Sequence, residues 1–134
     1  MNTTIEMILR LLLAAALGAG IGYQRERANK PAGLRTHTLI ALGSALFTVV
    51  SIFGFGSGVD VSRVAAGVVT GIGFIGAGVI FRGMRGHHVM GLTTAASVWI
   101  TAAIGLAAGV GMYLIAFIVA VVAVLVLMIP RVKG

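Results

Sequence analysis

Only three acidic side chains are available to bind a cation or move a proton. Glu6 and Arg10 are four residues apart, which places them on one face of a helix as an ion pair. Asp60 and Arg63 are three residues apart, and Asp60 or Ser62 could cap the helix that follows. We expect two separate ion pairs and a cap. The alternative is one cluster of all four charged residues between two helices.

Glu26 is the third acid, and it lies among basic residues in the segment QRERANKPAGLR. We expect its carboxylate to hold Arg35 or Arg82 and so to fix the turn at Pro31 and Gly33. A functional role is equally open, because ionisable groups at the edge of a membrane span are functional candidates by default.

Histidines and hydroxyls supply the remaining chemistry, since the chain has no cysteine for a thiolate ligand or nucleophile. His37 could sense pH, although such a residue is more often a satisfied interfacial group. His87 and His88 are adjacent and point in different directions, so we expect no metal site. Two rows of hydroxyls are expected to hydrogen-bond between helices rather than to line a polar path: Ser44, Thr48 and Ser51, and Thr93, Ser97 and Thr101.

The stretch GIGFIG at residues 71–76 fits the G-x-G-x-x-G pattern of a dinucleotide-binding loop. That loop needs a strand before it, a helix after it and an acid about 20 residues later. GIGFIG instead lies inside an apolar run, and Asp60 is the last acid of the chain. The sequence therefore favours glycines that let helices pack closely, and we expect no nucleotide cofactor.

Hydropathy indicates the elements that position these residues. The 134 residues are 59% hydrophobic and 10% charged, and the mean hydropathy is +1.10, which is typical of a membrane protein. Five apolar segments have about the length of a membrane-spanning helix, at about residues 5–23, 36–55, 62–81, 92–108 and 112–129. The last two must be separate helices, because one helix over both would be about 57 Å long. The sequence thus predicts an all-α integral membrane protein with five transmembrane helices.

The basic residues predict the orientation of the five helices. If there are five spans, eight of the ten lysines and arginines lie at one side of the membrane. Arg10 and Arg63 are the two on the other side. Positive residues accumulate on the cytoplasmic side, so the N-terminus should be outside and the C-terminus in the cytoplasm. The net charge of +7 is explained by this distribution, and we expect no nucleic-acid partner.

Small residues predict how the helices pack. Glycines lie on two faces of the third segment, so we expect that helix to be central and buried on both sides; they are Gly67, Gly71, Gly73, Gly76 and Gly78. The fifth segment has no glycine and should face lipid. A ridge of Ala14, Gly18 and Gly22 in the first segment could meet a second copy, which favours a homo-oligomer, most simply a dimer.

Three stretches together resemble the membrane domain of the MgtC/SapB family of bacterial inner-membrane proteins. They are GIGYQRERANKPAGLRTHTLIALGSALF, DVSRVAAGVVTGIGFIGAGVIFRG and GLTTAASVWITAAIGLAAG. The resemblance covers about residues 10–113. It adds Arg27, Arg35, Thr93 and Thr94 to the candidate functional residues Glu26, His37, Asp60 and Arg63. Many members of the family continue into a soluble C-terminal domain. We expect residues 1–134 to form a single transmembrane domain without that soluble domain.

The resemblance implies a role in adaptation to low magnesium and in survival inside phagocytes, and some members are linked to control of the proton-driven ATP synthase. We therefore expect a regulatory inner-membrane protein that acts by contact with another membrane protein. The alternative is a transporter or channel for a small cation such as magnesium, although no carboxylate lies near the middle of a span. An enzyme is disfavoured, because the chain has neither a P-loop nor a nucleophile–base pair.

Overall fold

The computed structural model describes residues 3–83 and 91–130, and these residues form five helices. The helices are α1 (Thr3–Arg27), α2 (Leu34–Phe53), α3 (Ser62–Gly83), α4 (Leu92–Gly109) and α5 (Tyr113–Leu127). The expectation of an all-α fold with five helices is confirmed. The first four helices are long and apolar enough to span a membrane. The 15 residues of α5 extend about 22 Å, which is less than the roughly 30 Å of a hydrocarbon core.

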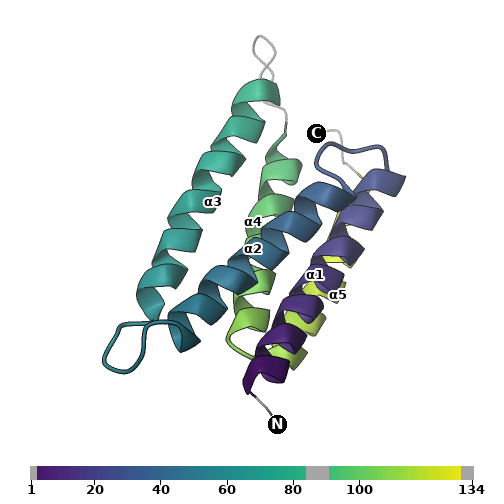
Figure 1. The fold of residues 1–134 in the computed structure, drawn as a ribbon. Helices are drawn as coiled ribbons and strands as arrows, with labels where there is room; N and C mark the ends of the chain where they lie inside the picture. The colour runs from purple at the N-terminus through teal and green to yellow at the C-terminus, as the bar shows by residue number, and fades with distance from the viewer. Residues whose placement is uncertain (1–2, 84–90, 131–134) are drawn as a thin grey trace.

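Consecutive helices run in opposite directions, so their ends gather at two poles of the bundle (Figure 1). One pole holds the α1–α2 turn, the end of α3, the start of α4 and the end of α5. We call it the α4 N-terminal pole. The opposite pole holds the start of α1, the α2–α3 loop and the α4–α5 turn. The predicted orientation would place the α4 N-terminal pole in the cytoplasm.

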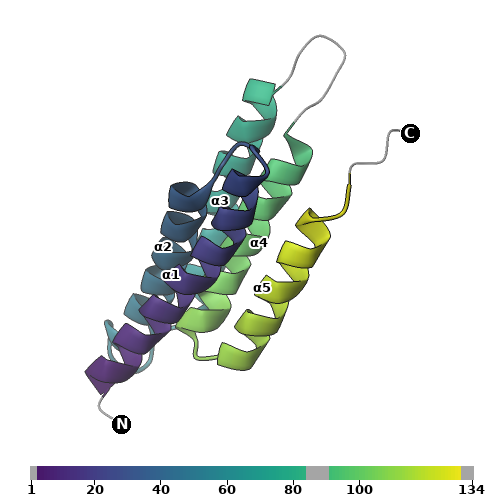
Figure 2. The same ribbon diagram turned by 90° about the vertical axis from the view of Figure 1, so that its right-hand side faces the viewer.

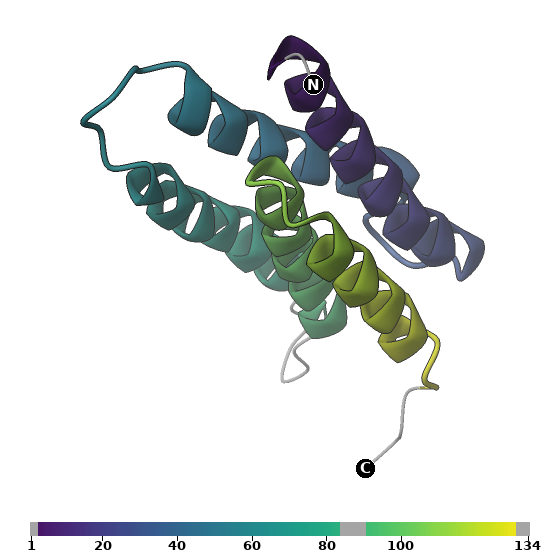
Figure 3. The same cartoon turned by 90° about the horizontal axis from the view of Figure 1, so that it is seen from below.

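Helix α4 is the centre of the bundle, because it packs against all four other helices. Figures 2 and 3 show α3 and α5 on its opposite flanks. Glycines allow the close approach to α2. A Cβ added at Gly105 would lie 2.3 Å from the Ala41 carbonyl oxygen, and one at Gly109 would lie 2.7 Å from the Thr48 Cβ. The prediction of a central third helix was therefore wrong.

Helix α3 is peripheral. It packs on α4 and makes few contacts with α2, and Ile72 is its one buried hydrophobic residue among those described. A Cβ at Gly76 would contact the Ala95 Cβ of α4 at 3.8 Å. The other four glycines expected to pack against helices would have no atom within 4 Å of such a Cβ; they are Gly67, Gly71, Gly73 and Gly78. No described residue therefore packs closely against these four glycines.

The small-residue ridge of α1 is occupied inside the chain rather than by a second copy. A Cβ at Gly18 would lie 2.6 Å from the His37 carbonyl oxygen, and one at Gly22 would lie 2.7 Å from the Gly33 carbonyl oxygen. Ala14 is fully buried in the same interface. This ridge joins α1 to α2, so it no longer supports a dimer.

Helix α5 lies at the edge of the bundle, as its composition predicted. Its alanines face α1 and α4 and are buried, at Ala116, Ala120 and Ala123. Its larger side chains point outward, and Leu114 and Leu125 are among the most exposed. An apolar surface of this kind suits contact with lipid.

Candidate functional site

A buried polar cluster joins α1, α2 and α4 near the α4 N-terminal pole. Its members are Arg25, His37, Thr94 and Ser97, and each is almost entirely buried. The structure thus brings together two of the predicted residues, His37 and Thr94. Arg25 was assigned to the first connection, but α1 continues to Arg27 and carries the Arg25 side chain into the bundle.

Arg25 connects the α1–α2 turn to α4. One terminal nitrogen of its guanidinium donates hydrogen bonds to the Pro31 carbonyl oxygen at 3.0 Å and to the Thr94 hydroxyl. The Nε atom of Arg25, like that of Arg10, is buried without an acceptor among the residues that the structure describes. The turn that supplies the Pro31 carbonyl is tight, with Ala32 in the left-handed region at φ +58°.

His37 has contacts at both ring nitrogens. Nδ1 lies 3.0 Å from the Gly33 carbonyl oxygen, which can only accept, so Nδ1 carries a proton. Nε2 lies 2.9 Å from the Ser97 hydroxyl. That hydroxyl also lies 2.7 Å from the Thr94 carbonyl oxygen, to which it donates. A hydroxyl has one proton to donate, so neutral His37 competes with Thr94 for it, whereas an imidazolium would donate to Ser97.

The spacing of small residues in the sequence could have predicted that Arg25 is buried. Ala14, Gly18 and Gly22 mark the face of α1 that packs on the bundle, and Arg25 follows Gly22 by three residues. This spacing continues the same helical face. A helix drawn to Arg27 would have predicted a buried arginine there.

The other candidates at this pole are exposed. Glu26 does not pair with Arg35 in the described part of the chain, and its carboxylate lies over the turn, where a Cβ at Gly33 would be 2.8 Å from Oε1. The alternative pair with Arg82 stays a prediction. Arg27 stacks on Tyr23 with 5.8 Å between the guanidinium carbon and the ring centroid. Arg35 and Thr93 are exposed. The side chain of Arg82, and all of His87 and His88, lie outside the described residues.

At the opposite pole, Glu6 and Asp60 have different kinds of partner. Glu6 binds Arg10 at 2.6 Å, as predicted. Asp60 accepts hydrogen bonds from the Ser62 hydroxyl and backbone N–H rather than from Arg63, and these bonds lower the pKa of Asp60. The predicted cap is present, but the predicted Asp60–Arg63 pair is not.

The alternative of one four-residue cluster is not formed among the described residues, and Arg10 instead links α1 to α4. Arg10 donates to the Gly109 carbonyl oxygen at 2.9 Å and lies over the Phe53 ring. No group of three His, Cys, Asp or Glu side chains in the described part of the chain is placed to hold a metal ion.

The hydroxyl rows bond between helices only in part. Ser44 donates to the Ala102 carbonyl oxygen of α4 at 2.7 Å, and Ser97 meets His37 of α2, whereas Ser51 donates to the carbonyl oxygen of Val61 in the α2–α3 loop at 3.1 Å. Thr48 and Thr101 instead bond to carbonyls of their own helices.

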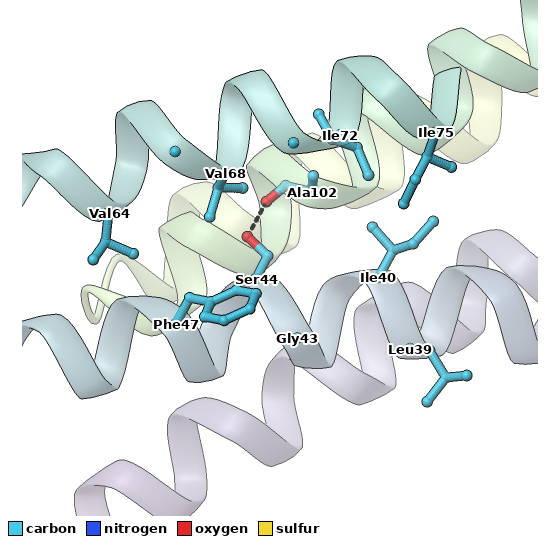
Figure 4. Close-up of a pocket in the computed structure, with 12 residues that line it drawn as sticks. Leu39, Ile40, Gly43, Ser44, Phe47, Val64, Val68, Ile72, Ile75 and Ala102 are labelled. Carbon is cyan, nitrogen blue, oxygen red and sulfur yellow. Dashed lines mark hydrogen bonds between the residues drawn. The ribbon is translucent and has the colours of Figure 1, made fainter. Parts of the chain in front are cut away.

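A groove of about 640 Å³ lies between α2 and α3, with α4 at its floor (Figure 4). Val64, Val68 and Ile75 of α3 point toward α2, and the Ser44–Ala102 hydrogen bond crosses the floor. The walls contain three glycines, Gly43, Gly67 and Gly71, and a Cβ at any of them would meet no atom within 4 Å. The groove is therefore apolar, and its backbone is open to close approach.

This fold and its polar cluster define a multi-pass helical membrane protein. The model of the MgtC family matches residues 11–133, and the chain belongs to this family. GIGFIG lies in the middle of α3, without the strand and turn that a dinucleotide-binding loop requires. No solved structure matches the chain.

Several curated relatives support this membership. The chain is 54% identical over 117 residues to the "Putative magnesium transporter YhiD" of Escherichia coli (strain K12), covering 82% of this chain and 54% of that protein. It is 46% identical over 121 residues to the protein SrpB of Synechococcus elongatus, covering 81% and 66%. It is 48% identical over 99 residues to the protein MgtC of Brucella abortus (strain 2308), covering 74% and 40%. The chain thus spans about half the length of the first of these relatives.

Proposed function

We propose that this chain is a regulatory protein of the bacterial inner membrane that acts by helix–helix contact with another membrane protein. The observation that carries the proposal is the groove between α2 and α3. A Cβ added at Gly43, Gly67 or Gly71 would meet no atom of the described residues within 4 Å. Membrane helices associate where small residues let their backbones approach closely.

The rest of the bundle supports a helix as the occupant. Wherever α1 or α4 meets α2, glycines mark the closest approach, as at Gly18, Gly22, Gly105 and Gly109. The glycines of the groove have the same character but no partner. A transmembrane helix of another protein would supply that partner. The resemblance implies adaptation to low magnesium as the setting and the ATP synthase as a partner.

The test compares leucine substitutions at two glycines of α3. Gly71 lines the groove, whereas Gly73 points away from it, two residues along the same helix. Neither added side chain would meet an atom within 4 Å at its Cβ, so both variants should fold. Gly71→Leu should abolish support of growth in low magnesium, and Gly73→Leu should retain it at equal expression. Equal behaviour of the two variants would contradict the proposal.

Cation transport is the second candidate, and the name of the Escherichia coli relative favours it. The described acids do not form a path for a cation, since Glu6 is paired with Arg10 while Glu26 and Asp60 are exposed at opposite poles. Purified protein in liposomes with a magnesium-reporting dye separates the two candidates. Uptake above that of empty liposomes would favour transport.

A further inference from the structure

His37 is an ionisable side chain that is fully buried where the α1–α2 turn meets α4. Its Nδ1 donates to the Gly33 carbonyl oxygen of the turn, and its Nε2 lies 2.9 Å from the Ser97 hydroxyl of α4. When that hydroxyl donates its one proton to the Thr94 carbonyl oxygen, neutral Nε2 is left without a donor. A second proton on the ring would let Nε2 donate to Ser97 and would complete the row of hydrogen bonds.

The positive charge that this proton brings would face the Arg25 guanidinium. The charge of Arg25 acts on His37, and both side chains reach the start of α4, Arg25 at the Thr94 hydroxyl and His37 at the Ser97 hydroxyl. Arg25 is 3% exposed and forms no ion pair with a described carboxylate. A second cation in this cluster would therefore lack a counter-charge, and the burial of an unpaired charge is strongly unfavourable.

The other ionisable groups that the structure describes near this pole lie outside the cluster. Helix α4 contains no ionisable side chain. The ionisable side chains of the α1–α2 turn and of the helix ends beside it are exposed; they are Tyr23, Glu26, Arg27, Lys30 and Arg35. On α3, Arg63 is exposed at the start of the helix, and the Arg82 side chain lies outside the described residues. The charge of the cluster thus depends on Arg25 and on the protonation of His37.

The α1–α2 turn is the element that this conflict of charges would move. Arg25 holds the turn on α4 through the Pro31 carbonyl oxygen at 3.0 Å. Ala32 lies in the left-handed region at φ +58°, which alanine rarely adopts. Its side chain packs against a buried apolar cluster that includes Val98 of α4. The turn is thus held in a conformation that it would not favour without the contacts of Arg25 and His37.

We propose that His37 is a proton-operated switch that controls whether the α1–α2 turn is held on α4. With neutral His37, Arg25 stays in the cluster and the turn is closed. Protonation of His37 displaces Arg25, and the turn leaves α4. The proton binds more readily after Arg25 has moved away, so the closed turn is stable above the titration range of a free imidazole, about pH 6.5, and is lost as the pH falls through it. The switch is separate from the groove and does not rest on the proposed partner contact.

The test measures how fast a maleimide labels a single cysteine in the turn, in the full chain in maltoside micelles. The chain has no cysteine of its own, so Ala32→Cys reports on a partly buried position and Ala28→Cys on an exposed position of the same turn. The ratio of the two labelling rates cancels the intrinsic pH dependence of the thiol. We expect this ratio to rise about fivefold or more between about pH 7.5 and 5.5, because one linked proton can shift the equilibrium by up to about tenfold per pH unit. A constant ratio would overturn the proposal.

Histidine variants assign the response. His37→Gln cannot gain the charge, so its labelling ratio should stay constant with pH. The matched control combines His87→Gln with His88→Gln, because these are the other two histidines of the chain, and the rise should be unchanged. If His37→Gln does not fold, the imidazole NMR signals of the double variant decide, since the protonation midpoint of His37 should coincide with that of the labelling ratio. A rise that persists in His37→Gln, disappears in the double variant or has a different midpoint from His37 contradicts the switch.

Discussion

Ser97 is the residue on which the buried polar cluster depends. Its hydroxyl lies between the His37 Nε2 and the Thr94 carbonyl oxygen, so it links α2 to the first turns of α4. Bulk solvent does not reach this contact, because Ser97 is 2% exposed and His37 is fully buried. Together with the bond from Nδ1 to the Gly33 carbonyl oxygen, this side chain sets the ring orientation of His37.

We predict that Ser97→Ala lowers the free energy of unfolding by roughly 0.6–2 kcal/mol, the usual range for a hydrogen bond between membrane helices. Reversible unfolding in mixed micelles measures this change. Thr70→Ala is the control, because Thr70 is exposed and bonds only to the Ala66 carbonyl oxygen of its own helix. Equal stability of Ser97→Ala and the parent would show that His37 needs no partner at Nε2.

At the level of the elements, α4 holds the bundle together through glycine contacts with α2. Gly105 is the tightest of these, since an added Cβ would lie 2.3 Å from a backbone oxygen of α2. We predict that Gly105→Ala forces α2 and α4 apart and lowers the yield of folded protein, because backbone cannot move aside as a flexible side chain can. Gly73→Ala should fold like the parent, as that position is open. Size-exclusion profiles and thermal unfolding compare the two, and a normal Gly105→Ala protein would contradict this packing.

The helices themselves were predictable from the sequence, because bilayer thickness sets the length of an apolar run. The packing partners of each helix were not predictable. Both α3 and α4 contain several glycines, and a single sequence does not show whether a glycine packs against another helix of the same chain. Two of the predicted hydroxyls were a better guide to the α2–α4 contact, since Ser97 of α4 meets His37 and Ser44 of α2 donates to the Ala102 carbonyl oxygen.

The site was predicted in part. His37 and Thr94 were named among the candidates, and the Ser97 hydroxyl links the two in the structure. Glu26 is exposed at the end of α1, and its role at this pole stays a prediction. Arg25 was missed because arginines near a predicted boundary are assigned to the connection, although the helical spacing from Gly22 placed it in the core.

For the whole molecule, the orientation in the membrane remains a prediction from the basic residues. Eight of ten lie at one side of a five-span arrangement, which should place the C-terminus in the cytoplasm. A reporter that is active only outside the cytoplasm, fused after Gly134, should be silent, and the same reporter fused before Met1 should be active. A strong signal from the C-terminal fusion would reverse the orientation or change the number of spans.

Contact between the α2–α3 groove and a helix of another membrane protein is the central claim, and photo-cross-linking in living cells tests it most directly. A photoreactive amino acid at position 43 would lie on the α2 wall of the groove, where the structure has room for it. The same probe at position 73 lies on the far face of α3 and serves as the reference. We predict a discrete protein adduct from position 43 in low magnesium, and none from position 73. A cross-link only to a second copy of this chain, only to lipid, or equally from both positions would contradict the claim.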